Sequence, residues 1–269
     1  MNEHRMLEAR LTAGELDGTL VRLYGAPRLE AVRARCAAVL DRYAKTFGSR
    51  PEALFSAPGR TELGGNHTDH QHGRVLAAAV DLDVLAAAAP NQSGMIRVQS
   101  EGYPLLVVDL AELSPRPEEA NTSAALIRGV AARLAVLGCP LQGAGLDAYV
   151  VSNVPGGSGL SSSAAFEVLV GAMLSGLFWP GRCSPVEIAQ IGQYAENVYF
   201  GKPCGLMDQT ASSVGGVVAI DFADPARPQV EQIPLDFAAT GHALCILDSG
   251  AGHADLTAEY AAITAELRA

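Results

Sequence analysis

The stretch VPGGSGLSSSAA at residues 154–165 places three glycines and four serines directly before an apolar segment that predicts a helix. The glycines at 156, 157 and 159 allow the backbone to approach a ligand closely and to adopt positive φ angles. The first turn of the following helix offers unpaired N–H groups and the positive end of the helix dipole. The loop and the helix together therefore predict an anion site suited to a phosphate group.

This glycine loop is of neither common nucleotide-binding type. It lacks the lysine of the G-x-x-x-x-G-K-[ST] loop, and its glycines are not spaced as G-x-G-x-x-G. The hydroxyls of Ser161, Ser162 and Ser163 suit contacts with phosphate oxygens or with Mg²⁺. A plain strand–turn–helix joint with a serine cap stays open as the alternative on loop chemistry alone.

A second group of polar residues, His67, Asp69, His70 and His72, lies within six positions of the chain. Imidazole and carboxylate groups at such short spacing are candidate ligands of a transition metal. The spacing is irregular and no cysteine accompanies the histidines, so a metal site is the less favoured interpretation of this segment.

Four stretches together resemble the GHMP small-molecule kinases, and within them the galactokinases. The glycine loop resembles the second motif of the superfamily, and APGRTELGGNHTDHQHG (57–73) resembles the galactokinase signature. AENVYFGKPCGLMDQTAS (195–212) resembles the segment that carries the catalytic aspartate, and DLTAEYAAI (255–263) is similar to a later sugar-contacting helix. The matches occur in family order over about residues 25–269.

The resemblance implies ATP-dependent phosphorylation of galactose at its anomeric hydroxyl, which gives galactose 1-phosphate. It implies that Asp208 is the catalytic aspartate, which accepts or orients the proton of that hydroxyl. Arg60 matches the arginine beside it, whose charge would hold Asp208 ionised and offset charge on the moving phosphoryl group.

The resemblance also implies the remaining site residues. The implied sugar contacts are Asn66, His67, Asp69, Gly205 and Tyr260. The implied ATP contacts are Pro155, Gly156, Gly157, Ser158, Gly159, Leu160, Ser161, Ser162 and Ser163. Ser162 and Glu196 match the positions that hold Mg²⁺, an ion that needs few protein oxygens because phosphates and water complete its shell.

The chain departs from the galactokinase signature at several positions. Asn66 stands where a glutamate is usual, Glu62 where an asparagine is usual, Gly64 where a larger apolar residue is usual, and His70 where a tyrosine is usual. Gly252 and His253 replace a basic pair before the later helix. The sugar preference is therefore less well defined than the chemistry.

The third, late glycine-rich motif of these kinases is missing from the sequence. We therefore expect a complete N-terminal domain at residues 1–225 and only the start of a C-terminal domain at 226–269. Apolar surface left by an incomplete domain would favour self-association. The alternatives left open are a GHMP kinase for another hexose or an amino sugar, a non-catalytic sugar and ATP sensor, and an inactive fragment.

The elements that must position these residues follow from apolar periodicity and turn signals. Helices are predicted at 27–47, 122–137, 161–177, 184–199 and 255–268, and strands at 75–89, 95–100, 105–110, 147–153, 215–222 and 243–250, with a further strand from about residue 53. Strands and helices do not alternate as strict βαβ units, so the predicted class is α+β, a GHMP-kinase-like two-domain fold.

Composition limits the partners. The 269 residues carry a formal net charge of -10, which disfavours binding to nucleic acid or to an anionic membrane surface. The sequence predicts no membrane span and shows no secretory signal. Five scattered cysteines indicate reduced thiols, so a cytoplasmic protein is expected.

Overall fold

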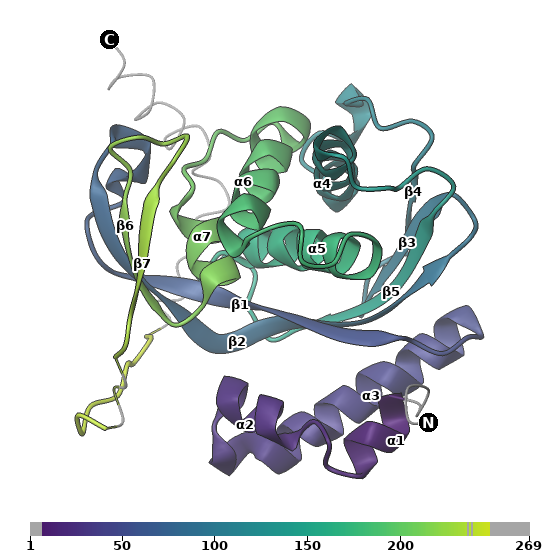
Figure 1. Ribbon diagram of the computed structural model, residues 1–269, viewed down its shortest axis with the longest axis horizontal. Coiled ribbons are helices and arrows are strands. Elements are labelled where there is room, and N and C mark those ends of the chain that lie inside the picture. Colours follow the sequence, from purple (N-terminus) through teal and green to yellow (C-terminus); the bar gives the residue numbers. More distant parts are fainter. Residues whose placement is uncertain (1–6, 236, 238, 248–269) are drawn as a thin grey trace.

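The computed structural model describes residues 7–235, 237 and 239–247 of the chain, and it centres on one mixed sheet (Figure 1). The strands are β1 (Ala53–Gly64), β2 (Arg74–Asn91), β3 (Met95–Ser100), β4 (Leu106–Asp109), β5 (Gly145–Ser152), β6 (Val217–Asp221) and β7 (Gln229–Ile233). The order is β4-β3-β5-β2-β6-β7, and β1 also pairs with β2. Only the β3–β5 pairing is parallel among these strands.

The 18-residue strand β2 pairs with three other strands of this sheet. Its first residues pair with β6, its last eight pair with β5, and β1 runs antiparallel along it. The β1–β2 register shifts between Pro58 and Arg60 and again between Glu62 and Gly64. Such bulges twist a strand and redirect its side chains, and these two bracket the segment Arg60–Glu62.

The N-terminal helices cover one face of the sheet (Figure 1). They are α1 (Leu7–Thr12), α2 (Asp17–Tyr24) and α3 (Leu29–Phe47), with a 3₁₀ turn at Ala26–Arg28. The apolar side of α3, including Leu40 and Tyr43, packs on Leu85 and Ala87 of β2. The helix ends at Gly48, whose left-handed φ of 66° suits glycine.

The remaining helices cover the opposite face (Figure 1). They are α4 (Ser123–Leu137), α5 (Ser162–Phe178), α6 (Pro185–Ala195) and α7 (Met207–Val214), with a π-helical turn at Glu196–Phe200 and 3₁₀ turns at Thr68–Gln71 and Pro117–Glu119. Helix α5 is apolar all round and is buried between the sheet and its neighbouring helices. Ser184 and Glu187 form the reciprocal capping box that starts α6.

Most elements predicted from periodicity are present within a few residues of their predicted bounds, and the mixed α+β class is confirmed. The strand predicted at 243–250 is wrong for residues 243–247, which are irregular and exposed. An isolated apolar run cannot remain a strand without a neighbour for its backbone groups. Residues 248–250 and the helix predicted at 255–268 lie outside the described residues.

Four of the described helices and strands were not predicted: α1, α2, α7 and β7. Helix α7 carries Asp208, but its eight residues are too short and too polar to give a clear periodic pattern. Strand β7 follows the irregular segment after β6 and pairs with that strand, so residues 229–233 extend the same sheet. The division into domains at 1–225 and 226–269 stays a prediction. Within the described part of the chain, no helix is long and apolar enough to cross a bilayer.

Candidate active site

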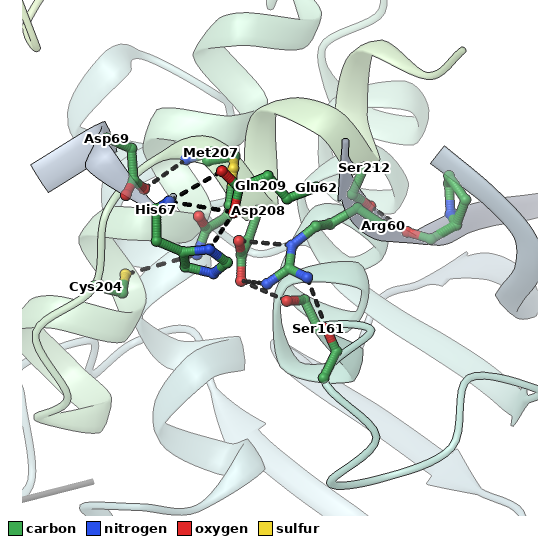
Figure 2. A network of polar contacts seen from close by, with 12 residues as sticks. Arg60, Glu62, His67, Asp69, Ser161, Cys204, Met207, Asp208, Gln209 and Ser212 are labelled. Carbon is green, nitrogen blue, oxygen red and sulfur yellow. Dashed lines mark hydrogen bonds and ion pairs between the residues drawn. The ribbon is translucent and has the colours of Figure 1, made fainter. Parts of the chain in front are cut away.

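A bidentate ion pair between β1 and α7 forms the centre of the candidate site (Figure 2). Arg60 donates from Nε to Oδ1 of Asp208 and from Nη2 to Oδ2, both at 2.7 Å. These residues are 148 positions apart in the chain. The parallel N–H groups of a guanidinium match the two oxygens of a carboxylate, which fixes both side chains in orientation.

The end of the glycine loop is attached to the same arginine. Nη1 of Arg60 donates to the carbonyl oxygen of Gly159 at 2.6 Å, and the backbone N–H of Arg60 donates to the carbonyl oxygen of Leu160 at 3.1 Å. Strand β1 lies close to the loop here, and only a glycine fits at position 59, because a Cβ there would lie 2.8 Å from that Leu160 oxygen. One arginine therefore fixes the position of the loop relative to Asp208.

Ser161 completes the contact between the loop and Asp208. Its hydroxyl donates to Oδ2 of Asp208 (Figure 2). Ser161 precedes α5 in a left-handed conformation with φ 56°, which is uncommon for a residue other than glycine. Strain of this kind is typical of a loop whose shape is imposed by its surroundings.

The charge state of Asp208 follows from this network. Burial alone raises the pKa of a carboxyl, but the charge of Arg60 and the hydrogen bonds from Arg60 and Ser161 outweigh it, so the pKa of Asp208 lies below its ordinary value. The side chain of Asp208 is still 31% exposed, whereas that of Arg60 is 8% exposed. An ionised carboxylate is thus held at an open edge of the network.

The remaining loop residues form the turn between β5 and α5. Pro155, Gly156, Gly157 and Gly159 are exposed, and a Cβ on Gly156 or Gly157 would meet no atom within 4 Å. Gly157 and Gly159 have φ of 71° and 76°. The Ser158 hydroxyl donates to the Pro155 carbonyl, and Ser162 and Ser163 open helix α5. The loop therefore leaves its backbone open to solvent directly before a long helix.

The loop after β1 carries two further predicted residues. Asn66 and His67 are both exposed, with positive φ of 56° and 53°. The backbone N–H of His67 donates to Oε1 of Glu62 at 2.9 Å, and its Nδ1 contacts Oε2 of the same carboxylate. A positive charge on the His67 ring is among the causes that lower the pKa of Asp208.

Asp69 is buried and holds the start of α7. Its Oδ2 accepts a hydrogen bond from the backbone N–H of Met207 at 3.1 Å, which satisfies one free donor of the helix (Figure 2). Gly205 leaves room for this carboxylate, because a Cβ there would lie 1.7 Å from Oδ2. Asp69 and Gly205 are therefore in direct contact beside Asp208.

Glu196 is buried and contacts Gln209, the residue after Asp208. Its Oε2 accepts from Nε2 of Gln209 at 2.9 Å, and its Oε1 lies 3.6 Å from Nζ of Lys202. Burial raises the pKa of Glu196. The described residues include no group of three His, Cys, Asp or Glu side chains arranged to hold a metal ion. Oε1 of Glu196 is only weakly engaged, and a carboxylate oxygen of this kind suits Mg²⁺ bound mainly by phosphates and water.

Gln209, next to Asp208, supports the site in a way that the sequence analysis missed. Its Nε2 also donates to Oε2 of Glu167 at 3.1 Å, so it joins α7 both to α5 and to the π-helical turn. Glu167 is fully buried, and burial raises its pKa well above the ordinary value. The available signal was a single glutamate inside the apolar segment AAFEVLV.

The structure brings Arg60, Asp208, His67, Asp69 and Ser161 together from β1, α7 and two loops. Glu62 is a further member that was noted only as a departure from the family signature. Tyr260, Gly252 and His253 lie outside the described residues.

Two family models match the chain. Residues 125–216 match the GHMP kinases N terminal domain, which covers the glycine loop and Asp208. Residues 41–90 match the galactokinase galactose-binding signature, which covers Arg60 and Asp69. The first match gives the class of kinase and the second gives the branch.

Individual relatives point to the same branch. The galactokinase of Streptomyces coelicolor is 36% identical over 222 residues, which are 82% of this chain and 56% of that protein. The galactokinase of Lacticaseibacillus casei is 33% identical over 195 residues, which are 72% of this chain and 50% of that protein. The chain thus belongs to the galactokinase family of GHMP kinases, and it spans about half the length of the curated relatives it matches.

Solved structures agree with this fold. The structure of Lactococcus lactis galactokinase complexed with galactose superposes with a TM-score of 0.70 at 25% identity, over 87% of this chain and 60% of that one. Mevalonate kinase from Methanococcus jannaschii superposes with a TM-score of 0.57 at 20% identity, over 72% of this chain and 58% of that one. The second likeness supports the GHMP fold alone.

Proposed function

We propose that this chain is the part of a galactokinase that aligns the sugar and the phosphate donor, and that the protein phosphorylates galactose at its anomeric hydroxyl using ATP. The observation that supports this most strongly is the Arg60–Asp208 ion pair with Ser161 of the glycine loop on the same carboxylate. A base for the acceptor alcohol and a loop for the donor phosphates are thereby adjacent.

In the proposed reaction, the anomeric oxygen of the sugar forms a bond to the γ-phosphorus of ATP as the bond from that phosphorus to the β,γ-bridging oxygen breaks. ADP leaves, and the hydroxyl proton passes to Asp208 and then to solvent. Phosphoryl transfer has a loose transition state, so it depends on alignment and charge neutralisation more than on a strong nucleophile.

The lowered pKa of Asp208 defines its part in this reaction. A carboxylate whose pKa lies below the ordinary range is a weak base towards a neutral alcohol. Asp208 therefore orients the hydroxyl by accepting its hydrogen bond, and takes the proton late, when bond formation has made the oxygen acidic. Arg60 keeps this carboxylate ionised and reduces the repulsion between it and the entering phosphates.

We assign Ser162 and Glu196 to hold Mg²⁺, which would neutralise charge on the nucleotide phosphates when bound. We assign residues 155–163 to ATP by their backbone N–H groups and hydroxyls, and Asn66, His67, Asp69, Gly205 and Tyr260 to the sugar. Tyr260 rests on the sequence resemblance alone.

The experiment is a coupled assay of ADP release across a panel of hexoses and amino sugars, with D208N as the matched variant. We expect galactose-dependent ADP release that exceeds the variant's by at least about 10³-fold. Preference for another hexose would replace the sugar in this proposal but leave the chemistry. Absence of turnover above D208N for every sugar would overturn the kinase assignment.

A further inference from the structure

Glu62 has no assigned role, although three contacts join it to a proposed sugar-binding residue. Both of its oxygens lie within hydrogen-bond distance of the His67 backbone N–H, at 2.9 and 3.2 Å, and Oε2 also contacts Nδ1 of the His67 ring. The Glu62 side chain is 13% exposed, whereas that of His67 is 47% exposed. A largely buried carboxylate thus holds an open imidazole.

The strand geometry explains how Glu62 reaches this position. Arg60, Thr61 and Glu62 pair in continuous register with Ala79, Ala78 and Ala77 of β2. Side chains two positions apart on a strand point to the same face, so Glu62 lies beside Arg60 and faces the Asp208 site. Its charge is among those that act on the Arg60 guanidinium.

The loop that carries His67 needs such a support. Asn66 and His67 both adopt left-handed φ values, a conformation that L-residues with side chains adopt at a cost. A carboxylate that accepts the His67 N–H satisfies the backbone in this conformation and opposes its relaxation. Asparagine tolerates the left-handed conformation better than histidine does, and it occupies the first of the two positions.

The contact also fixes the proton on the ring. A carboxylate oxygen only accepts hydrogen bonds, so the nitrogen that faces it, Nδ1, is the one that carries hydrogen. In the neutral ring Nε2 is then an unprotonated acceptor. A carboxylate behind a histidine sets the tautomer and the orientation of the ring in this way at many sites.

We propose that Glu62 is a positioning residue of the acceptor site, which holds His67 so that Nε2 faces the substrate as a hydrogen-bond acceptor for a sugar hydroxyl. The part of this inference that concerns the sugar rests on the proposed function, whereas the Glu62–His67 tautomer does not. The carboxylate that the signature usually places at position 66 stands here at position 62, and the amide usual at 62 stands at 66. Glu62 thus supplies the charge from the strand instead of from the loop.

The direct test is ¹⁵N NMR of the imidazole nitrogens at about pH 8, with the His67 signals assigned by H67Q. We expect the protonated nitrogen to be Nδ1 in the wild-type protein. In E62Q the amide oxygen can keep the backbone bond while its N–H faces Nδ1, which favours the opposite tautomer. Unchanged His67 signals in E62Q, or Nε2 protonation in the wild type, would overturn the assignment.

Two controls separate this effect from a change in folding. E101Q makes the same substitution in the turn after β3, on the other half of the sheet, and should leave the His67 signals as in the wild type. E62D retains the charge and should retain the wild-type tautomer if it reaches Nδ1. Should E62Q fail to fold by circular dichroism, the exchange variant E62N/N66E takes its place, and it is expected to lose Nδ1 protonation on loss of the strand carboxylate.

The kinetic test uses the acceptor and the donor separately. We expect E62Q to raise the KM for galactose about tenfold, as for one lost hydrogen bond, with the KM for ATP changed less than about twofold. In an H67A background E62Q should have no further effect on the galactose KM, because the two residues act through one contact. Equal effects of E62Q in both backgrounds would contradict the inference. Absence of any turnover in the wild type would contradict the proposed function, and the NMR result would still decide the role of Glu62.

Discussion

Two arginine–carboxylate networks lie on opposite faces of strands β1 and β2, and they differ in what remains open. On the α7 face, Arg60 holds Asp208, and Ser161 adds one hydroxyl. On the α3 face, Arg35 contacts Asp83 of β2, and the hydroxyls of Tyr24 and Ser56 bind the same carboxylate. The bond types are nearly the same in the two networks.

The difference is access. The Asp83 side chain is 3% exposed. The backbone carbonyl oxygen of Asp83 also accepts hydrogen bonds from Arg35 and from the backbone N–H of Asn153. The Asp208 side chain is 31% exposed and faces the glycine loop. Asp83 is thus surrounded by the protein's own helices, whereas Asp208 keeps an edge for a substrate. An ion pair of good geometry indicates function only where one side of it remains free.

The same substitution in both networks tests this comparison, and D208N is expected to give the larger effect. It removes the charge that orients the acceptor hydroxyl, so turnover should fall by about 10³- to 10⁴-fold. The free energy of unfolding should fall by only about 1–2 kcal/mol, because the carboxylate is partly solvated in the folded protein. ADP release and urea unfolding measure the two quantities, and a loss of stability above that range with turnover retained would reverse the assignment.

D83N is the matched variant in the closed network. An amide offers one acceptor oxygen where Arg35, Tyr24 and Ser56 all donate, so at least one partly buried hydrogen bond is lost. We expect the free energy of unfolding to fall by about 3 kcal/mol, with turnover per folded molecule within about twofold of the wild type. Urea unfolding and an assay corrected for the folded fraction check this. Turnover that falls as far as in D208N would show that the two networks are not distinct in function.

The sequence predicted the two networks unequally, for a physical reason. The glycine loop, Arg60 and Asp208 lie in motifs whose chemistry or resemblance is visible along the chain. Asp81 and Asp83 lie in an alanine-rich strand, and nothing along the chain indicates their partners, because Arg28 and Arg35 contact them from 53 and 48 positions away. Long-range pairings of this kind are set by the packing of α3 on the sheet, which periodicity alone does not specify.

The same limit applies inside the candidate site. Glu62 was visible as an unusual residue, but its contact with His67 depends on the register of β1 and on two left-handed residues in the following loop. Gln209 and Glu167 meet only because α5 and α7 pack side by side. The motifs therefore predicted the members of the Arg60–Asp208 network better than the residues that pack behind them.

The charge of Arg60 provides a pH test of the open network. In the wild type the folded-state pKa of Asp208 lies below its unfolded value of about 3.9, so its ionisation stabilises the fold above that pH and the stabilisation is lost as pH falls through the folded-state pKa. R60Q removes the main cause of the lowering and leaves burial, so the pKa should rise above the ordinary value. A carboxyl ¹³C NMR titration of Asp208 measures this. A pKa that stays low in R60Q would mean that the hydrogen bond from Ser161, and not the charge of Arg60, is the main cause that lowers the pKa of Asp208.

The smallest expected effect belongs to Y24F in the closed network. Tyr24 donates to Asp83 at 2.6 Å, so loss of this hydroxyl should lower the free energy of unfolding at pH 7 by about 1–2 kcal/mol, with turnover unchanged. Burial, and then the charge of Asp83, raises the pKa of Tyr24 above 10. Its contribution is therefore complete below pH 10 and declines as pH rises further, because the unfolded phenol ionises first. Urea unfolding of the wild type and Y24F should consequently converge above about pH 10. A gap that stays constant with pH would mean that the Tyr24 hydroxyl stabilises the fold through Ser56 and not through the Asp83 carboxylate.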